Sequence, residues 1–259
     1  MSAAPVLALR GISKRFGAVQ ALTDVELEVH ASEVVALVGD NGAGKSTLVK
    51  TIAGVHSIDG GVIEWDGVPV SIHRPHDAQE LGIATVYQDL ALCDNIDVVG
   101  NLYLGRELSR RGVLDEVEME RRARELLDRL SIRIPSVRIP VASLSGGQRQ
   151  TVAIARSMLG EPRLVVLDEP TAALGVEQTA QVLDLVERLR ESGHAVILVS
   201  HNMADVKAVA DRVAVLRLGR NNGVFDVGST SQEEIVSAIT GATENAVTRR
   251  AARTGEVRR

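Results

Sequence analysis

The sequence predicts an α/β fold: a mostly parallel sheet core with an N-terminal antiparallel β subdomain and an inserted α-helical subdomain. Two continuous aliphatic runs, Val34–Val38 and Ala195–Val199, predict strands that are covered on both faces, as in parallel sheets. A third run, residues 164–167, precedes a segment, Val176–Glu191, whose apolar residues recur at helical spacing. A strand, a helix and a strand in this order are typical of a parallel crossover.

The N-terminal part of the chain predicts an antiparallel sheet. Residues 24–30 alternate apolar side chains with acids, which is typical of a half-buried antiparallel strand. Residues 62–65 and 68–72 flank Asp66 and Gly67, a dipeptide found in two-residue hairpin turns. Pro69 has no backbone N–H to donate, so we expect the second of these strands at a sheet edge.

The middle of the chain, residues 89–159, is rich in charge and in helix-forming residues, so we expect the inserted helical subdomain there. Residues 115–130 predict an amphipathic helix whose acids and arginines form a solvated face. We expect its apolar side to consist of Val117, Ala123, Leu126, Leu127 and Leu130.

The chain ends in a short helix and a basic segment. Ser231 and Glu234 have the spacing of a capping box, and Gly241 suits a helix end. Residues 242–259 contain five arginines, two glutamates and few apolar residues, so we expect a disordered basic tail. A segment attracted to anionic lipid is the alternative.

Composition excludes several classes of protein. The 259 residues are 45% hydrophobic and 24% charged, with a net charge of −5, so neither global disorder nor a general attraction to nucleic acid is expected. No apolar run approaches the ~20 residues that span a bilayer. The first nine residues lack the pattern of a secretion signal. Cys93 is the single cysteine, which excludes an internal disulfide and fits a reducing compartment.

A glycine-rich loop carries the first chemical signal. Residues 39–46 match G-x-x-x-x-G-K-S directly after an aliphatic strand and before a helix, as in P-loop NTPases with a RecA-like core. Glycines let the backbone N–H groups approach phosphate oxygens, while Lys45 supplies positive charge and Ser46 a ligand for Mg²⁺. A tight turn without a ligand is the alternative. The expected phosphate-binding residues are Gly39, Asp40, Asn41, Gly42, Ala43, Gly44, Lys45, Ser46 and Thr47.

Two carboxylates follow the strand at residues 164–167. Ligands of open α/β sheets bind at the carboxyl ends of the strands, where Asp168 and Glu169 lie. We expect Asp168 to belong to the Mg²⁺ shell and Glu169 to polarise the attacking water. Acids that cap a helix are the alternative. Lys45 and Asp168 are 123 residues apart, so the helical subdomain is inserted between the two halves of the site.

His201 ends the next aliphatic strand, 33 residues after Asp168. Neighbouring parallel strands end side by side, so we expect His201 to reach Glu169 and the γ-phosphate. A histidine with only a surface or packing role is the alternative.

A second glycine-rich helix start identifies the family. Residues 144–148 read L-S-G-G-Q, with Ser145 as an N-cap. This is the signature motif of ATP-binding cassette (ABC) proteins. With the phosphate loop, the Asp168–Glu169 strand and His201 in this order, the chain resembles an ABC ATP-binding domain over residues 6–241. The resemblance implies a catalytic core with its β subdomain at 6–88 and 160–241, and a helical signature subdomain at 89–159.

The resemblance implies further roles. Phe16 matches the aromatic residue that stacks on adenine, with a core phenylalanine as the alternative, and Gln88 matches the glutamine that touches Mg²⁺. It also implies that Ser145, Gly146, Gly147 and Gln148 bind the γ-phosphate of ATP held by a second copy in a head-to-tail homodimer. The catalytic residues would be Glu169 and His201, with Ser46, Gln88 and Asp168 around Mg²⁺.

Longer stretches, including residues 87–92 and 169–176, resemble monosaccharide importers of the ribose, xylose and fructose type, in their single-cassette branch. This implies a peripheral ATPase subunit on the cytoplasmic face of the membrane that works with a permease and, indirectly, an external sugar-binding protein. The permease contact is expected near residues 88–106, including Tyr103. Gly175 departs from the aspartate usual at that position in the family. An importer or exporter of another cargo, an ABC ATPase acting on nucleic acid or ribosomes, and a small-molecule kinase remain alternatives.

Overall fold

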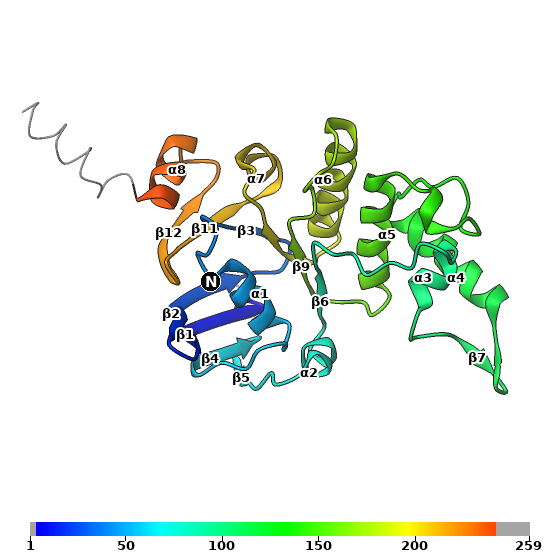
Figure 1. Ribbon diagram of the computed structural model, residues 1–259, viewed down its shortest axis with the longest axis horizontal. Helices are drawn as coiled ribbons and strands as arrows, with labels where there is room; N and C mark the ends of the chain where they lie inside the picture. Colours follow the sequence, from blue (N-terminus) through cyan, green and yellow to red (C-terminus); the bar gives the residue numbers. More distant parts are fainter. Residues whose placement is uncertain (1–3, 242–259) are drawn as a thin grey trace, which may run out of the picture.

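The computed structural model describes residues 4–241 and contains two main sheets (Figure 1). The six-stranded sheet has the order β12-β11-β3-β10-β9-β6. Its strands β3, β10, β9, β6 and β11 are parallel, and β12 is an antiparallel edge. Their bounds are Val34–Val38 (β3), Ile83–Val86 (β6), Leu164–Asp168 (β9), Ala195–Val199 (β10), Arg212–Arg217 (β11) and Arg220–Asp226 (β12).

Alternate residues of the parallel strands are buried on opposite faces of this sheet. Val34, Ala36 and Val38 of β3 belong to one apolar core, whereas Val35 and Leu37 belong to the other. The strand is therefore covered on both sides, as its continuous aliphatic sequence predicts. The β9–α6–β10 crossover is confirmed, with α6 at Val176–Glu191 and β10 paired parallel to β9.

The antiparallel sheet is confirmed as well, with the order β2-β1-β4-β5. β5 is the edge strand that Pro69 predicts, and it pairs with β4 across the turn at residues 66–67. The bounds are Leu7–Phe16 (β1), Val19–Val29 (β2), Gly60–Trp65 (β4) and Val68–Val70 (β5). Helix α1, Lys45–Ile52, contributes Leu48, Val49 and Ile52 to the apolar core that this sheet shares with the parallel sheet.

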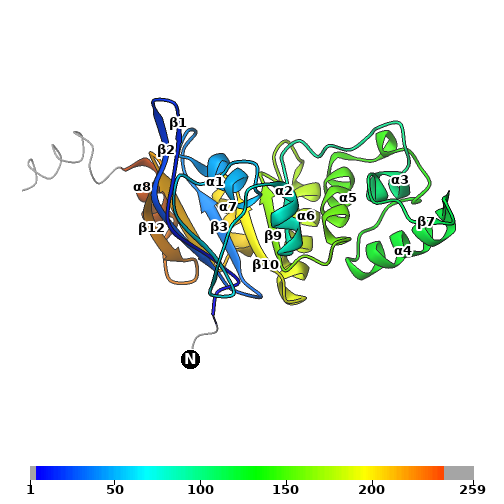
Figure 2. The ribbon, with the colours of Figure 1, turned by 90° about the horizontal axis from the view of Figure 1, so that it is seen from below.

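The remaining helices pack beside and beyond the parallel sheet. Figures 1 and 2 place α3, α4 and the β7–β8 hairpin at the end of the molecule farthest from the antiparallel sheet. Among residues 4–241, no helix combines the length and the apolarity needed to cross a bilayer. The bounds are Pro75–Glu80 (α2), Val98–Tyr103 (α3), Glu116–Arg129 (α4), Gly146–Met158 (α5), Met203–Val209 (α7), Gln232–Thr240 (α8), Ser109–Arg110 (β7), Val113–Leu114 (β8) and a 3₁₀ turn at Val141–Ser143.

The prediction for the amphipathic helix α4 is wrong in one residue of its apolar side. Val117 is 81% exposed, whereas the buried side is formed by Met119, Ala123, Leu126 and Leu127. Val117 lies two positions before Met119, which puts it about 200° around the helix from that residue and outside the buried stripe. The capping box of Ser231 and Glu234 in α8 is confirmed. The expected basic tail, 242–259, lies outside the described residues.

Candidate functional site

The glycine-rich loop joins β3 to α1 and is held tightly against neighbouring backbone. A Cβ at Gly39 would lie 2.2 Å from the carbonyl oxygen of Leu216, so only glycine fits there. Gly44, the residue before α1, has a φ of 104°, which favours glycine for a second reason. Ala43 is buried, while Asp40 and Asn41 are exposed. The loop is therefore anchored in the core and presents its turn to solvent.

Lys45 folds back over this loop. Its Nζ donates hydrogen bonds to the carbonyl oxygens of Gly39 at 2.6 Å and Asp40 at 3.1 Å. Ser46 and Thr47 follow in the first turn of α1, whose leading N–H groups have no partner within the helix. Positive charge, a hydroxyl group and free backbone donors thus gather at one end of α1, a combination that suits phosphate.

Asp168 ends β9 close to this loop. Burial raises the pKa of Asp168, the charge of Glu169 raises it further, and Lys45 and Lys50 oppose the shift. Strands β3, β10 and β9 pair in parallel in this order, so the loop after β3 and Asp168 at the end of β9 lie at the same edge of the sheet, although 123 residues separate Lys45 from Asp168 in the chain. The sequence expectation that the two halves of the site meet is consistent with this arrangement.

Glu169 has a strained backbone. Its φ is 51°, in the left-handed region that residues with a Cβ rarely adopt. Its N–H donates to the carbonyl oxygen of Val199 at the end of β10, at 3.0 Å. Strain of this kind persists where surrounding structure enforces it and is frequent at functional sites.

His201 lies against Glu169, as the strand order predicts. Its Nδ1 is 2.7 Å from Oε2 of Glu169. The histidine side chain is 72% exposed and the glutamate side chain 16%. His201 is therefore no packing residue, and its imidazole contacts the carboxylate from the solvent side.

Gln88 follows β6, the strand beside β9. Val86 of β6 pairs with Leu167, one residue before Asp168, so residues 87 and 88 emerge beside residues 168 and 169. Burial, followed by the charge of Asp168, raises the pKa of the neighbouring Tyr87. Gln88 itself is exposed.

Phe16 ends β1 and is 43% exposed, so the alternative that it is a core residue is wrong. His56 contacts its ring edge-on at 5.0 Å between centroids, and Lys14 Nζ lies 5.5 Å from the ring centroid. In the same hairpin, Lys14 pairs with Leu22, whose side chain packs beside Gly44 of the glycine-rich loop. The hairpin thus brings an exposed aromatic ring to the side of the loop.

Ser145 caps helix α5. Its Oγ accepts a hydrogen bond from the Gln148 N–H at 3.3 Å, and its N–H donates to Gln148 Oε1 at 3.0 Å. Ser145 and Gly146 are exposed, whereas a Cβ at Gly147 would lie 2.8 Å from the side chain of Gln178 on α6. In both views β9 and α6 lie between α1 and α5 (Figures 1 and 2). Within one chain, the structure does not bring the signature residues to the glycine-rich loop.

Sequence reasoning missed Asp205. This residue of α7 is 5% exposed and accepts hydrogen bonds from Thr171 Oγ1 at 2.6 Å and from Asn202 Nδ2 at 3.0 Å. A signal existed in the sequence, because Asp205 lies four residues before the buried Val209 and hence on the inner side of the helix.

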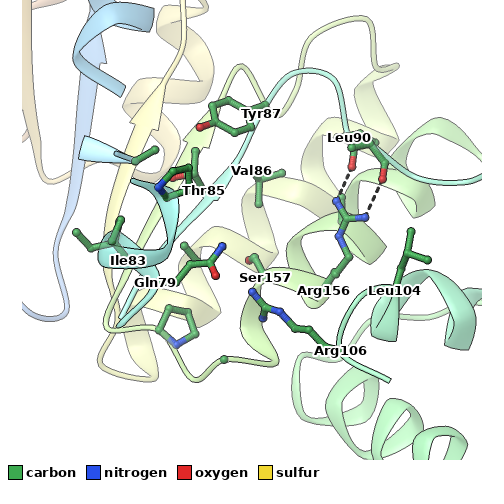
Figure 3. A pocket seen from close by; sticks show the side chains of 18 of the residues that line it. Gln79, Ile83, Thr85, Val86, Tyr87, Leu90, Leu104, Arg106, Arg156 and Ser157 are labelled. Carbon is green, nitrogen blue, oxygen red and sulfur yellow. Dashed lines mark hydrogen bonds between the residues drawn. The ribbon is translucent and has the colours of Figure 1, made fainter. Parts of the chain in front are cut away.

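A groove of about 300 Å³ lies between the parallel sheet and α5. Figure 3 shows its walls, which include Thr85 and Tyr87 on one side and Arg156 and Leu104 on the other. Arg156 is tied down by hydrogen bonds to the carbonyl oxygens of Leu90 and Ala91, both at 2.8 Å. The described residues that line the groove include two arginines, 106 and 156, and a single acid, Asp89. Tyr103 is 4% exposed and offers little surface itself.

Comparison with known proteins gives consistent matches. A model of the ABC transporter family matches residues 22–172. The chain is 43% identical to the xylose/arabinose import ATP-binding protein XylG of Sulfolobus acidocaldarius, over 91% of this chain and 94% of that protein. It is 40% identical to the fructose import ATP-binding protein FrcA of Rhizobium meliloti, over 94% and 97%. It is also 42% identical to the ribose import ATP-binding protein RbsA 1 of Rubrobacter xylanophilus, of which it spans half.

Solved structures agree on the fold. The cassette MJ1267 of an ABC transporter, in its ADP conformation, matches with a TM-score of 0.79 at 25% identity, covering 91% of this chain and 95% of that one. The cbiO1 structure from Clostridium perfringens, part of an ABC transporter complex, matches with a TM-score of 0.77 at 27% identity over 90% and 92%. A dimeric cassette, MJ0796 with ADP and phosphate, matches with a TM-score of 0.71 at 25% identity over 85% and 98%.

Proposed function

The chain belongs to the ABC transporter family of ATP-binding proteins, and we propose that it is the ATPase subunit of a monosaccharide importer. The single observation that supports this most is the meeting of Lys45, Asp168, Glu169 and His201 at one edge of the parallel sheet. The xylose, fructose and ribose import proteins are similar over nearly the whole chain, which supports a sugar of that class as the cargo.

In this proposal the glycine-rich loop binds the phosphates of ATP. Lys45 moves from the carbonyl oxygens of Gly39 and Asp40 to the β- and γ-phosphates, and the N–H groups at the start of α1 donate to phosphate oxygens. Phe16 stacks on the adenine ring. Glu169 accepts a proton from the attacking water, while His201 orients the glutamate and contacts the γ-phosphate.

The oxygen donors of the site fit Mg²⁺. Ser46, Gln88 and Asp168 offer a hydroxyl, an amide and a carboxylate oxygen, the hard ligands that this ion prefers. Partial burial and the charge of Glu169 disfavour the ionised carboxylate of Asp168, and a bound cation would offset this cost. When bound, Mg²⁺ offsets the negative charge of the phosphates.

We propose that two copies of the chain share two ATP molecules head to tail. The support is the separation of α5 from the glycine-rich loop within one chain (Figures 1 and 2) together with the dimeric form of a structural neighbour. Ser145 to Gln148 of one copy would then donate to the γ-phosphate held by the other copy.

The groove between the parallel sheet and α5 is proposed as the permease contact (Figure 3). Its lining includes Tyr87 and residues 89–91, which flank Gln88 in the chain, so a movement of Gln88 would be transmitted to the groove through the backbone. Arg106 and Arg156 favour a partner segment that carries an acid. The complex would sit on the cytoplasmic face of the membrane, with an external sugar-binding protein delivering the cargo to the permease.

Two other readings are less well supported. An ABC ATPase acting on nucleic acid or ribosomes would gain from a positively charged surface, but the chain carries a net charge of −5. A small-molecule kinase leaves the capped signature helix without a role. Transport of another cargo stays open, because the cassette itself does not touch the cargo.

The experiment is co-expression with the permease subunit of a monosaccharide importer from the same organism, followed by purification and measurement of phosphate release. We expect a stable complex whose ATPase activity differs from that of the isolated subunit. Arg106→Glu should weaken the complex, whereas Arg110→Glu, an exposed arginine outside the groove, serves as the matched control. Equal loss of the complex in both variants, or in neither, contradicts the proposed contact.

A further inference from the structure

Two loops meet behind the Glu169–His201 pair. The first loop, residues 169–175, follows β9, and the second, residues 200–202, follows β10 and leads into α7, which begins at Met203 and contains Asp205. The bond from the Glu169 N–H to the Val199 carbonyl oxygen attaches the first loop to the end of β10, and the contact of His201 with the Glu169 carboxylate joins it to the second loop. The third connection is made by Asp205, which contacts neither of those side chains but holds Thr171.

Both carboxylate oxygens of Asp205 accept a hydrogen bond. Oδ2 accepts from Thr171 Oγ1 at 2.6 Å, and Oδ1 accepts from Asn202 Nδ2 at 3.0 Å. A carboxylate that is 5% exposed is costly to bury, and such groups are retained where hydrogen bonds satisfy them. Asp205, in the first turn of α7, therefore joins the first loop to the second through two hydrogen bonds, and its side chain is almost inaccessible to water.

Asp205 is not needed to cap α7. The side chain of Asn202 already does so, since its Oδ1 accepts from the Ala204 N–H at 3.0 Å. Asn202 is also fixed from the other side, where its N–H donates to Ser200 Oγ at 3.0 Å. The bond to Thr171 is thus a connection between loops in addition to the local helix cap.

Two backbone hydrogen bonds shape the first loop, from the Ala172 N–H to the Glu169 carbonyl oxygen at 3.1 Å and from the Leu174 N–H to the Thr171 carbonyl oxygen at 3.2 Å, but neither attaches it to the second loop. Glu169 has a φ of 51° and Ala173 a φ of 60°, two strained positions within five residues. Residues 172–175 are Ala, Ala, Leu and Gly, which carry no polar side chain. Within this loop, after Glu169, the hydroxyl of Thr171 is the side-chain group that can hydrogen-bond to the body of the protein.

We propose that Asp205 is a positioning residue: through Thr171 and Asn202 it fixes the loop after β9 against the loop after β10, and so keeps Glu169 aligned with His201. This inference rests on the proposed ATPase function. Its consequence is that the strained backbone of Glu169 is maintained by a buried carboxylate 36 residues farther along the chain.

The test uses two matched pairs of variants. Thr171→Val keeps the shape of the side chain and removes the hydroxyl, whereas Thr171→Ser keeps the hydroxyl. Asp205→Ala removes both acceptors, whereas Asp205→Asn can still bond both partners if the threonine hydroxyl turns to accept. Asp184→Asn, on the exposed side of α6, is the control for loss of a negative charge.

We expect Thr171→Val and Asp205→Ala to lower kcat between about tenfold and about a hundredfold, since small misplacements of catalytic groups have effects of this size. KM for ATP should stay within about twofold, because the phosphate loop is unchanged. Thr171→Ser and Asp205→Asn should retain most of the activity. The double variant Thr171→Val/Asp205→Ala should be no worse than Asp205→Ala alone, because both changes break the same connection.

A second readout does not depend on turnover. Amide hydrogen exchange at residues 171–175 and 201–205 should accelerate in Thr171→Val and stay at the wild-type rate in Thr171→Ser. If the wild type fails to hydrolyse ATP, the proposed function fails, yet the exchange result still decides the inference. Additive effects in the double variant, equal behaviour of the valine and serine variants, or unchanged exchange in Thr171→Val would overturn it.

Discussion

Nδ1 of His201 lies 2.7 Å from Oε2 of Glu169, and this contact joins the ends of two neighbouring parallel strands. The carboxylate is mostly buried and the imidazole mostly exposed, so the histidine covers the glutamate on its solvent side. We take this pair to be the part of the site that acts on the attacking water.

Glu169→Gln should bind ATP and form the ATP-dependent dimer, but its turnover rate should fall at least ~100-fold. General-base catalysis usually contributes a factor of this size. The amide keeps the size of the side chain and still accepts a hydrogen bond from His201, but it cannot take a proton from water. Phosphate release and ATP binding are measured on the same preparation. Wild-type-like phosphate release by this variant would refute the assigned role of Glu169.

Asp168→Asn should raise the melting temperature of the nucleotide-free protein at pH 8 in the presence of a chelator. Burial, then the charge of Glu169, raises the pKa of Asp168 above 3.8. A carboxyl whose pKa is raised by folding stabilises the fold below its unfolded pKa, and this contribution is lost as the pH rises through the folded pKa.

The gain from Asp168→Asn should therefore shrink as the pH falls from 8 toward 4, because the wild-type carboxyl becomes neutral as well. Thermal unfolding of both proteins across this range provides the measurement. A lower melting temperature of the variant at pH 8 is incompatible with the account. Hydrolysis with Mg²⁺ should be lost in the same variant, which separates stability from function.

Phe16→Ala should raise the Kd for ATP at least about fivefold, as stacking of a base on an aromatic ring stabilises by about 1–3 kcal/mol. The melting temperature should change little, because the ring is 43% exposed. Phe16→Trp is the control, since it keeps an aromatic face. If the alanine variant binds ATP as tightly as the wild type, Phe16 does not contact adenine.

A mixture of two inactive variants should regain activity if the sites are shared between copies. In a mixed dimer, one chain carries Lys45→Ala and the other carries Ser145→Arg. One of its two sites then combines the intact Lys45 of one chain with the intact Ser145 of the other. Neither parent homodimer has such a site. Phosphate release is measured for each parent and for the mixture, and a mixture no more active than its parents would exclude head-to-tail sharing.

Much of the site could be predicted because it depends on local context. The loop at residues 39–46 lies between an aliphatic strand and a helix, and Asp168, Glu169 and His201 each follow a strand, so the parallel sheet gathers them at one edge. The resemblance of the chain to the ABC family covers the same residues and is confirmed.

Other features depend on long-range packing and could not be predicted. The bond between Thr171 and Asp205 forms because the loop after β9 and the start of α7, which α6 and β10 separate in the chain, fold against each other, and no periodicity specifies this. Val117 is different: it is apolar, but it lies about 200° around α4 from Met119, so the helical periodicity of the sequence already places it outside the buried stripe. The groove beside Arg106 arises from the approach of α5 to the parallel sheet.

The most direct measurement is ATP-dependent uptake of a labelled monosaccharide by vesicles that contain a monosaccharide permease from the same organism, a sugar-binding protein and this chain. Ribose, xylose and fructose are tested separately, with Glu169→Gln as the matched control. We predict uptake of at least one of these sugars with the wild-type chain and ATP, and none above background with Glu169→Gln. Equal uptake with the variant, or ATP hydrolysis by the wild type without uptake of any of the three sugars, would contradict the account.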